Sequence, residues 1–261
     1  MTEETYETID FVVGDDRVAT ITLDRPDVLN AFDQRMLEEF VHAWGRVRDD
    51  DGIHVAVLRA NGTRAFSTGV DLQNPLHWPD NVWNHTDPGL ALGPRSNRVW
   101  KPVVCAVHGM VAGGAFYWLN ESDIVICSDD ATFFDPHVSY GFTAALEPIG
   151  LARRMPLGEV MRIALMGLDE RMSAERALAI GLVSEVLPLD QLHDRAQAIA
   201  ATIAAKPTAA VQGTVRAIWE SLDVGRTAAL ERGMAYTQIG NPLGTAEVAR
   251  TGVAKPRWTL R

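Results

Sequence analysis

Two segments decide the interpretation of this chain: His108-Gly109-Met110-Val111-Ala112-Gly113-Gly114-Ala115 and the earlier Arg64-Ala65-Phe66-Ser67-Thr68-Gly69-Val70-Asp71-Leu72. They follow the apolar runs Val103–Val107 and Val55–Leu58, which are typical of buried strands. Each segment carries glycine where the chain must turn, and glycine lets the backbone approach a ligand closely. We therefore predict two strand-to-turn transitions, the second of which opens a helix.

The flanking sequence alternates strand and helix patterns. Ile9–Val13 and Val18–Leu23 predict a hairpin around Gly14-Asp15-Asp16, and Asp33–Arg48 predicts a helix with Asp33 as its N-cap. The later apolar runs, including Ile124–Cys127, are continuous rather than alternating. Such runs are typical of strands covered on both faces, so we predict an α/β fold with a mostly parallel sheet.

The second half of the chain is predicted to be almost wholly helical. The expected helices are Glu159–Met166, Ser173–Ile180, Leu189–Ala204, Thr208–Leu222, Arg226–Ile239 and Thr245–Val253. We expect a core over residues 1–195 and a C-terminal helical region over residues 196–261. Between Gln73 and Arg98 lies a long polar stretch with Trp78 and Trp83, which favours a substrate-shaping loop over disorder.

Composition excludes several classes of protein. The chain has 261 residues, a formal net charge of −10 and no basic cluster, which argues against nucleic acid as a partner. It has no apolar run long enough to span a membrane, and its acidic start lacks a signal sequence, so we expect a cytoplasmic protein. Cys105 and Cys127 lie in strand-like runs and are expected to be buried hydrophobes.

The glycine segments suit one kind of chemistry. A helix that begins near Gly113 and Gly114 would point unpaired N–H groups outward, and two such groups that converge on one oxygen form an oxyanion hole. A thioester carbonyl, which gains negative charge during reaction, fits that device. Singly, each segment could be only a tight turn. The sequence has no phosphate loop of the GxxxxGK form, no metal-ligand spacing and no evident Ser, His and acid arrangement.

Together with their flanks, the two segments resemble the enoyl-CoA hydratase/isomerase (crotonase) family. The resemblance extends from about residue 9 to 258. Besides the two glycine segments it rests on Leu23-Asp24-Arg25-Pro26, Leu29-Asn30-Ala31, Lys101-Pro102-Val103, Ser122-Asp123-Ile124, Ala174-Glu175-Arg176-Ala177, Gly181-Leu182-Val183 and Lys255-Pro256-Arg257-Trp258.

The resemblance implies a crotonase-like spiral of ββα units with a C-terminal helical trimerisation region. It implies a homotrimer or hexamer, an acyl-CoA substrate and no permanently bound cofactor, since coenzyme A is part of the thioester substrate. It places the oxyanion donors at the N–H groups of Val70 and Gly114. The positions that it assigns to coenzyme A binding are Arg25, Arg64, Asp71, Leu72, Lys255 and Trp258. Of these, Asp71 is also expected to orient its own loop.

The chain departs from the family at the acid and base. Hydratases of this family use two glutamates, and the corresponding positions hold Tyr117 and His137. A tyrosine, with a pKa near 10, would donate hydrogen bonds, whereas a histidine, near 6.5, can act as acid or base. Glu147, in an apolar context, is the third candidate. The alternatives are packing for Tyr117, a structural hydrogen bond for His137 and a helix-opening charge for Glu147.

Three hypotheses follow. The first is an enoyl-CoA hydratase or double-bond isomerase that uses His137 with Tyr117 or Glu147. The second keeps the oxyanion hole but carries out hydrolysis, decarboxylation or lyase chemistry on an acyl-CoA. The third is a pseudoenzyme that binds acyl-CoA without turnover.

Overall fold

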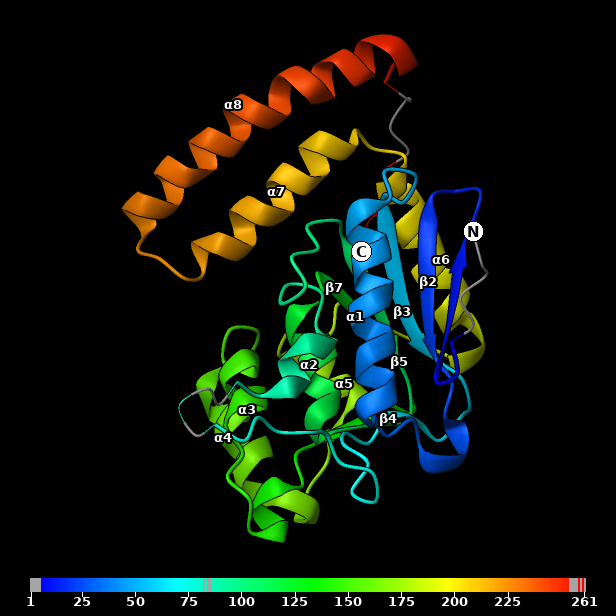
Figure 1. Cartoon of the computed structure of the whole chain (residues 1–261), viewed down its shortest axis with the longest axis vertical. Coiled ribbons are helices and arrows are strands. Elements are labelled where there is room, and N and C mark those ends of the chain that lie inside the picture. The colour runs from blue at the N-terminus through cyan, green and yellow to red at the C-terminus, as the bar shows by residue number, and fades with distance from the viewer. Residues whose placement is uncertain (1–5, 82, 84–85, 254–257, 259, 261) are drawn as a thin grey trace.

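A six-stranded sheet forms the centre of the protein (Figure 1). The computed structural model describes residues 6–81, 83, 86–253, 258 and 260. The strand order is β1 (Ile9–Val13), β2 (Val18–Leu23), β3 (Val55–Ala60), β5 (Val103–Val107), β7 (Ile124–Ser128) and β10 (Glu185–Leu187). β1 and β2 form the predicted antiparallel hairpin, and every other neighbouring pair is parallel. The prediction of a mostly parallel sheet is confirmed.

A second, smaller sheet lies at the carboxyl ends of the central strands. Its order is β4 (Ala65–Ser67), β6 (Met110–Ala112), β8 (Thr132–Phe134) and β9 (Met172–Ser173). β3, β5 and β7 each lead into one of its strands, so the chain repeats a long strand, a short strand and a helical or looped return. This repeat is the predicted spiral of ββα units.

Both faces of the central sheet are covered, as the continuous apolar runs predicted. Along β3, Val55 and Val57 pack with α6 (Leu189–Ala204), whereas Ala56 and Leu58 belong to the cluster on the opposite face. On that face lie α1 (Gln34–Asp49) and α2 (Phe116–Glu121). The side chain of Asp33 accepts a hydrogen bond from the N–H of Met36 at 2.9 Å, so the predicted N-cap is present. Successive strand residues thus serve opposite layers.

The remaining short elements surround the carboxyl end of the sheet. They are η1 (Pro26–Val28), η3 (Pro88–Leu92), η4 (Gly113–Ala115), η5 (His137–Tyr140), α3 (Leu146–Leu151), α4 (Leu157–Met166), η6 (Gly167–Asp169) and α5 (Ala174–Ala179). Cys105 and Cys127 are buried and unpaired, as expected. No helix in the described ranges is long and apolar enough to cross a membrane.

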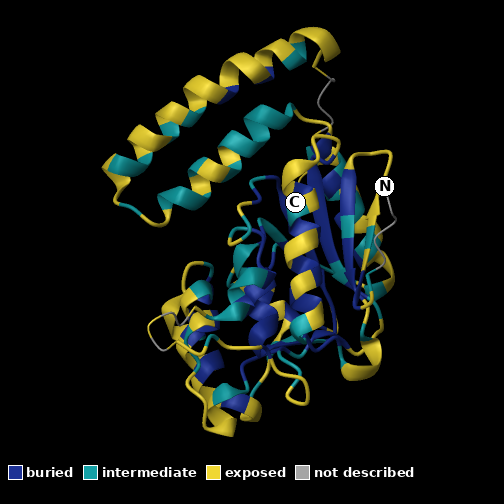
Figure 2. Cartoon of the chain, viewed as in Figure 1, coloured by how far each residue is buried: buried dark blue, intermediate teal, exposed yellow. Residues whose placement is uncertain are grey.

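The last two helices, α7 (Thr208–Ser221) and α8 (Arg226–Thr251), form a hairpin that stands away from the sheet (Figure 1). Most of α8 is exposed (Figure 2). The predicted break between Ile239 and Thr245 is wrong, because α8 continues through it with Pro242 inside the helix. Gly240 and Gly244 are buried against α7, so the small residues there allow close helix packing rather than a turn.

The predicted division after residue 195 remains a prediction. That position lies inside α6, whose buried face of Leu192, Ala196, Ala200 and Ala204 packs against the sheet. α6 is therefore described here with the sheet, and α7 and α8 as the hairpin.

Asp123 ties the hairpin to the core. The indole N–H of Trp219 on α7 donates to Asp123 Oδ1 at 2.6 Å, and the N–H of Val103 donates to Asp123 Oδ2 at 2.7 Å. The Arg95 guanidinium also contacts Asp123 and lies 5.2 Å from the centre of a Trp219 ring. One carboxylate thus joins α7, the start of β5 and the end of the long loop 73–98.

The side chains of His108 and His193 lie next to each other. The ring of His108 is fully buried and lies 6.3 Å from the ring of His193 on α6. Burial lowers the pKa of His193 from 6.5 to about 4, and nearby Arg59 and His108 add to this effect. Protonation of His193 therefore costs folding free energy.

We predict that acid destabilises the fold through His193. The unfolded chain binds a proton near pH 6.5 and the folded chain only near pH 4, so this stability is complete above 6.5 and lost as pH falls toward 4. Wild-type protein should lose about 2 kcal/mol more than His193→Gln between these pH values, as measured by urea unfolding. The exposed His77→Gln variant is the control and should follow wild type. Equal losses in wild type and His193→Gln would contradict the prediction.

Candidate active site

The first glycine segment is held by the buried side chain of Asn30. Its amide donates to the carbonyl oxygens of Asn61 at 2.9 Å and Ala65 at 3.0 Å, and its Oδ1 accepts from the N–H of Arg25 at 2.9 Å. Asn30 itself has a positive φ of 52°, which asparagine tolerates better than most residues. The Leu29-Asn30-Ala31 motif therefore stabilises the turn from which the segment departs.

Phe32 fixes the direction of the same segment. Its N–H donates to the carbonyl of Gly69 at 2.9 Å, and its carbonyl accepts from the N–H of Asp71 at 2.8 Å. The N–H of Val70, between these two bonded residues, faces away from Phe32. No hydrogen bond satisfies it within the described part of the chain.

The second segment is placed by Gly109 and by Trp118. Gly109 has a φ of +55°, and a Cβ there would lie 2.4 Å from the carbonyl oxygen of Arg64, so only glycine fits. Trp118 on α2 is buried among the rings of Phe32, Phe40 and Phe66, with centroid separations of 5.6, 5.1 and 5.9 Å. This packing fixes α2, and with it η4, against the first segment.

The two segments touch at Gly69 and Gly114. A Cβ at Gly69, where φ is +89°, would lie 2.9 Å from the amide nitrogen of Gly114. Gly114 N is at the start of η4, and no hydrogen bond within the described ranges uses its N–H. The amides of Val70 and Gly114 are therefore neighbours, both unpaired, at one point of the structure, which is the arrangement expected of an oxyanion hole.

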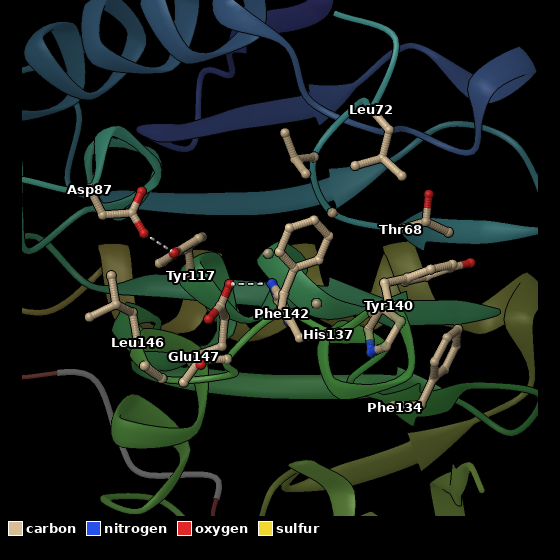
Figure 3. Close-up of a pocket in the computed structure, with 18 of the residues that line it drawn as sticks. Thr68, Leu72, Asp87, Tyr117, Phe134, His137, Tyr140, Phe142, Leu146 and Glu147 are labelled. Carbon is tan, nitrogen blue, oxygen red and sulfur yellow. Dashed lines mark hydrogen bonds and ion pairs between the residues drawn. The ribbon is translucent and has the colours of Figure 1, made fainter. Parts of the chain in front are cut away.

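A cavity of about 700 Å³ opens beside these amides (Figure 3). Val70, Gly113 and Gly114 line it, together with apolar side chains from the later elements. Those side chains are Leu72, Trp78, Phe134, Phe142 and Leu146. Its size and largely apolar lining are typical of a small-molecule site.

His137 enters this cavity between two carboxylates. Its Nδ1 lies 2.5 Å from Asp135 Oδ1, and its Nε2 lies 3.7 Å from Glu147 Oε1 (Figure 3). The hydrogen bond with Asp135 raises the pKa of His137, with burial opposing and the charges of Asp135 and Glu147 adding. Burial likewise raises the pKa of the Glu147 carboxyl. Each group therefore holds its proton to a higher pH than usual, and the two lie close enough together for proton exchange.

Tyr117 faces the same cavity from α2. Its hydroxyl donates to Asp87, which caps η3 by accepting from the N–H of Gly89 at 2.8 Å (Figure 3). Burial raises the pKa of Tyr117 well above its usual value, and the nearby Glu147 and Asp87 raise it further. Tyr117 is therefore neutral and cannot act as a base at neutral pH. The structure brings the three candidates Tyr117, His137 and Glu147 together.

The predicted coenzyme A positions have different surroundings. The guanidinium of Arg25 lies 3.1 Å from both Asp33 and Asp71. Asp71 also accepts a hydrogen bond from the N–H of Gln73 at 2.9 Å, so Asp71 orients the loop that contains it. Arg64 is exposed beside a separate hollow that also includes Asp27.

The other three predicted positions lie farther along the chain. Leu72 is 70% exposed at the rim of the main cavity. Trp258 is 80% exposed, and Lys255 lies outside the described residues. A role in coenzyme A binding remains a prediction for all six positions.

Asp87 and Asp135 are the site residues that the sequence did not identify. Asp87 follows a long irregular stretch, and no spacing in the sequence relates it to Tyr117. Asp135 is completely buried and stands two residues before His137, which is a weak but usable signal for an imidazole partner. The loop predicted to shape the substrate site contributes Trp78 and Asp87 to the cavity lining, whereas Trp83 is 94% exposed. In the described residues no group of three or more His, Cys, Asp or Glu is placed to hold a metal ion.

Comparison with known proteins agrees with this fold and site. The family model for enoyl-CoA hydratase/isomerase matches residues 14–239. An enoyl-CoA hydratase/isomerase structure from Mycobacterium paratuberculosis superposes with a TM-score of 0.86 at 35% identity, covering 98% of this chain and 100% of that one. The chain therefore belongs to the enoyl-CoA hydratase/isomerase family and is a crotonase-type acyl-CoA enzyme.

Two curated relatives show the range of reactions near this sequence. An (E)-benzylidenesuccinyl-CoA hydratase from Thauera aromatica is 33% identical over 85% of each chain. A (7aS)-7a-methyl-1,5-dioxo-2,3,5,6,7,7a-hexahydro-1H-indene-carboxyl-CoA hydrolase from Rhodococcus jostii is 32% identical over 93% of each chain.

We predict that Gly69→Ala blocks the oxyanion hole. The new methyl group would meet the Gly114 amide, so turnover should fall by about 100-fold or more, the loss expected when one donor is removed. Gly181→Ala is the matched control, because Gly181 has a similar φ of +82° but no atom within 4 Å of the new methyl group. It should incur the same backbone strain and keep its activity. Equal activity of the two variants on an acyl-CoA substrate would contradict the prediction.

Proposed function

We propose that this protein is an enoyl-CoA hydratase or double-bond isomerase. One observation carries the proposal: the paired His137 and Glu147 side chains, 3.7 Å apart, share a cavity with the unpaired amides of Val70 and Gly114. A proton-transfer pair beside an oxyanion hole is what reaction through a thioester enolate requires.

In the proposed reaction the thioester oxygen of an enoyl-CoA accepts hydrogen bonds from Val70 and Gly114. As the oxygen of a water molecule bonds to C3, the double-bond electrons move toward the thioester and form an enolate, whose negative oxygen the two amides stabilise. Collapse of the enolate takes up a proton at C2. In isomerisation, removal of a proton from C2 of a 3-enoyl-CoA gives a conjugated dienolate whose oxygen the same two amides stabilise, and a proton returns at C4.

His137 and Glu147 handle the protons in this proposal. Asp135 accepts the Nδ1 proton of His137, which leaves Nε2 to face Glu147 and the cavity. The pair shares one transferable proton, so either group can accept a proton from water while the other delivers one to C2. Two groups with complementary protonation states thereby replace the two glutamates of the family's hydratases.

Hydrolysis is the second candidate, and the Asp135–His137 pair favours it. A buried carboxylate that orients an imidazole is a general-base unit able to activate water for attack on a carbonyl. The relative from Rhodococcus jostii, named as a hydrolase, supports keeping this candidate. Release of free thiol, or cleavage of a carbon–carbon bond without change in enoyl absorbance, would favour it over hydration.

Assembly into a homotrimer or hexamer is part of the proposal. Large apolar side chains stay exposed along the hairpin, and a contact between subunits would cover them. These are Ile218, Leu222, Leu230, Met234, Ile239 and Leu243. In such an assembly Lys255 and Trp258 would reach the nucleotide end of coenzyme A bound to a neighbouring subunit.

We predict that His137→Ala lowers turnover of an enoyl-CoA substrate by about tenfold or more, because the imidazole carries the proton. Binding of the substrate should persist, since the amides that hold the thioester are unchanged. Loss of absorbance of the enoyl thioester measures the reaction, and calorimetry measures binding.

The exposed His77→Ala variant, outside the cavity lining, is the control for this measurement. It should match wild type in both rate and affinity. An unchanged rate in His137→Ala would remove His137 from the mechanism.

We also predict that Met234→Glu with Leu243→Glu dissociates the assembly, because a subunit contact would bury the new charges without partners. Sedimentation should show a shift toward the monomer. The control is Gln238→Glu, which adds charge at an exposed polar position of α8. A wild-type chain that sediments as a monomer would refute the assembly.

A further inference from the structure

Asp87 is the one carboxylate of the cavity that the proposed reaction leaves without a task. Both of its oxygens have partners: Oδ1 accepts from the N–H of Gly89 at 2.8 Å, and Oδ2 accepts from the hydroxyl of Tyr117. The backbone donor on one side and the phenol on the other hold the carboxylate in one orientation.

This contact decides whether the Tyr117 hydroxyl donates or accepts a hydrogen bond on its cavity side. A phenol has a single proton, and here that proton points at Asp87. Toward the cavity the hydroxyl can therefore offer only its lone pairs, so Tyr117 is a hydrogen-bond acceptor for whatever lies there.

The Tyr117 ring is fixed at a defined place. A Cβ at Gly89 would lie 2.7 Å from the ring, and a Cβ at Gly114 would lie 3.5 Å from it, so the ring is packed between the two glycines. Gly114 supplies the amide proposed to bind the thioester oxygen. With a thioester oxygen at that amide, as proposed, Tyr117 borders the part of the cavity that would hold the acyl carbons.

The other ionisable groups of the cavity complete the surroundings. Asp87, Tyr117, Glu147 and His137 follow one another across the cavity wall (Figure 3). Asp135 contacts His137 at Nδ1. Glu147 also lies within hydrogen-bonding reach of the Tyr117 hydroxyl, and both its charge and that contact raise the pKa of Tyr117. A small hydrogen-bond donor in the cavity would therefore meet two neighbouring acceptors, the Tyr117 oxygen and the Glu147 carboxylate.

We infer that Asp87 and Tyr117 form a hydroxyl-binding site. Asp87 turns the Tyr117 hydroxyl so that its oxygen accepts a hydrogen bond from the water that adds to the enoyl group, or from the hydroxyl of the hydrated acyl-CoA. Asp87 is a positioning residue, because it acts through Tyr117. The inference rests on the proposed function for its catalytic half, whereas recognition of a hydroxyl group is independent of turnover.

Asp87→Asn tests the inference by reversing the hydroxyl. The N–H of Gly89 keeps the amide oxygen of the new asparagine on its side, so the NH₂ group faces Tyr117 and donates to it. The Tyr117 proton then points into the cavity and opposes a bound hydroxyl. The cap of η3 survives, so the protein should fold, as circular dichroism would verify. We expect kcat for hydration to fall by about tenfold or more with KM changed by less than about threefold.

Tyr117→Phe and the double variant separate positioning from structure. Tyr117→Phe should lose a similar factor in kcat, and Asp87→Asn in the Tyr117→Phe background should lose little more, because both act on the same hydrogen bond. Asp80→Asn, at an exposed aspartate of the same loop outside the cavity, is the control and should match wild type. An Asp87→Asn enzyme with wild-type kcat would overturn the positioning role.

The pH dependence tests whether the charge of Asp87 reaches the proton-transfer pair. The negative charge of Asp87 raises the pKa values of both His137 and Glu147. Its removal in Asp87→Asn should move the pH profile of kcat toward lower pH. Tyr117→Phe keeps the charge and should leave the profile in place. A profile that does not move in Asp87→Asn would count against the assignment.

Binding distinguishes failure of this inference from failure of the proposed function. By calorimetry, wild type should bind 3-hydroxybutanoyl-CoA about fivefold more tightly than butanoyl-CoA, and both variants should lose that preference. If wild type shows the preference but hydrates no enoyl-CoA, the hydroxyl site stands and the proposed reaction fails. If wild type hydrates enoyl-CoA but shows no preference, the hydroxyl site is overturned and the reaction stands.

Discussion

The close approach of Gly69 to the amide of Gly114 is the constraint on which the site depends. A side chain at residue 69 would collide with that amide, so the two segments can meet only without one. Much of the local structure serves this contact. The Asn30 amide and the Phe32 main chain hold the first segment, and Trp118 holds the second against it. Two main-chain donors, which have no conformational freedom of their own, are thereby fixed before any ligand arrives.

In the proposed function the acid and base of the family's hydratases are replaced rather than lost. Tyr117 and His137, which the family resemblance places at the two glutamate positions, both contact carboxylates: Asp87 at Tyr117, and Asp135 with Glu147 at His137. The proposed site therefore keeps carboxylates, although a phenol and an imidazole stand where the family's hydratases have glutamates. The hydrogen bond with Asp135 raises the pKa of His137, so in the proposed site the imidazole keeps its proton to a higher pH than a free histidine would.

Sequence reasoning predicted the features that repeat or that require glycine. The hairpin, the parallel strands and the Asp33 cap follow from local patterns, and the unpaired amides follow from glycine at the ends of strands. It did not predict Asp87, because that residue reaches Tyr117 across an irregular loop and no spacing records the contact. It predicted a break between Ile239 and Thr245, where glycine instead permits close packing of α8 on α7. The sequence did not predict the short strands β4 and β6, because each lies inside one of the two glycine segments.

The carboxylate of Asp123 has a role beyond joining two elements. It receives the indole of Trp219 from the hairpin, the first amide of β5 and the guanidinium of Arg95, which ends the same loop that carries Asp87. The hairpin and the cavity wall thus share one anchor. Arg95 lies against the Trp219 ring on one side and bonds to Asp123 on the other, so a shift of α7 would reach the loop that carries Asp87 through a single side chain.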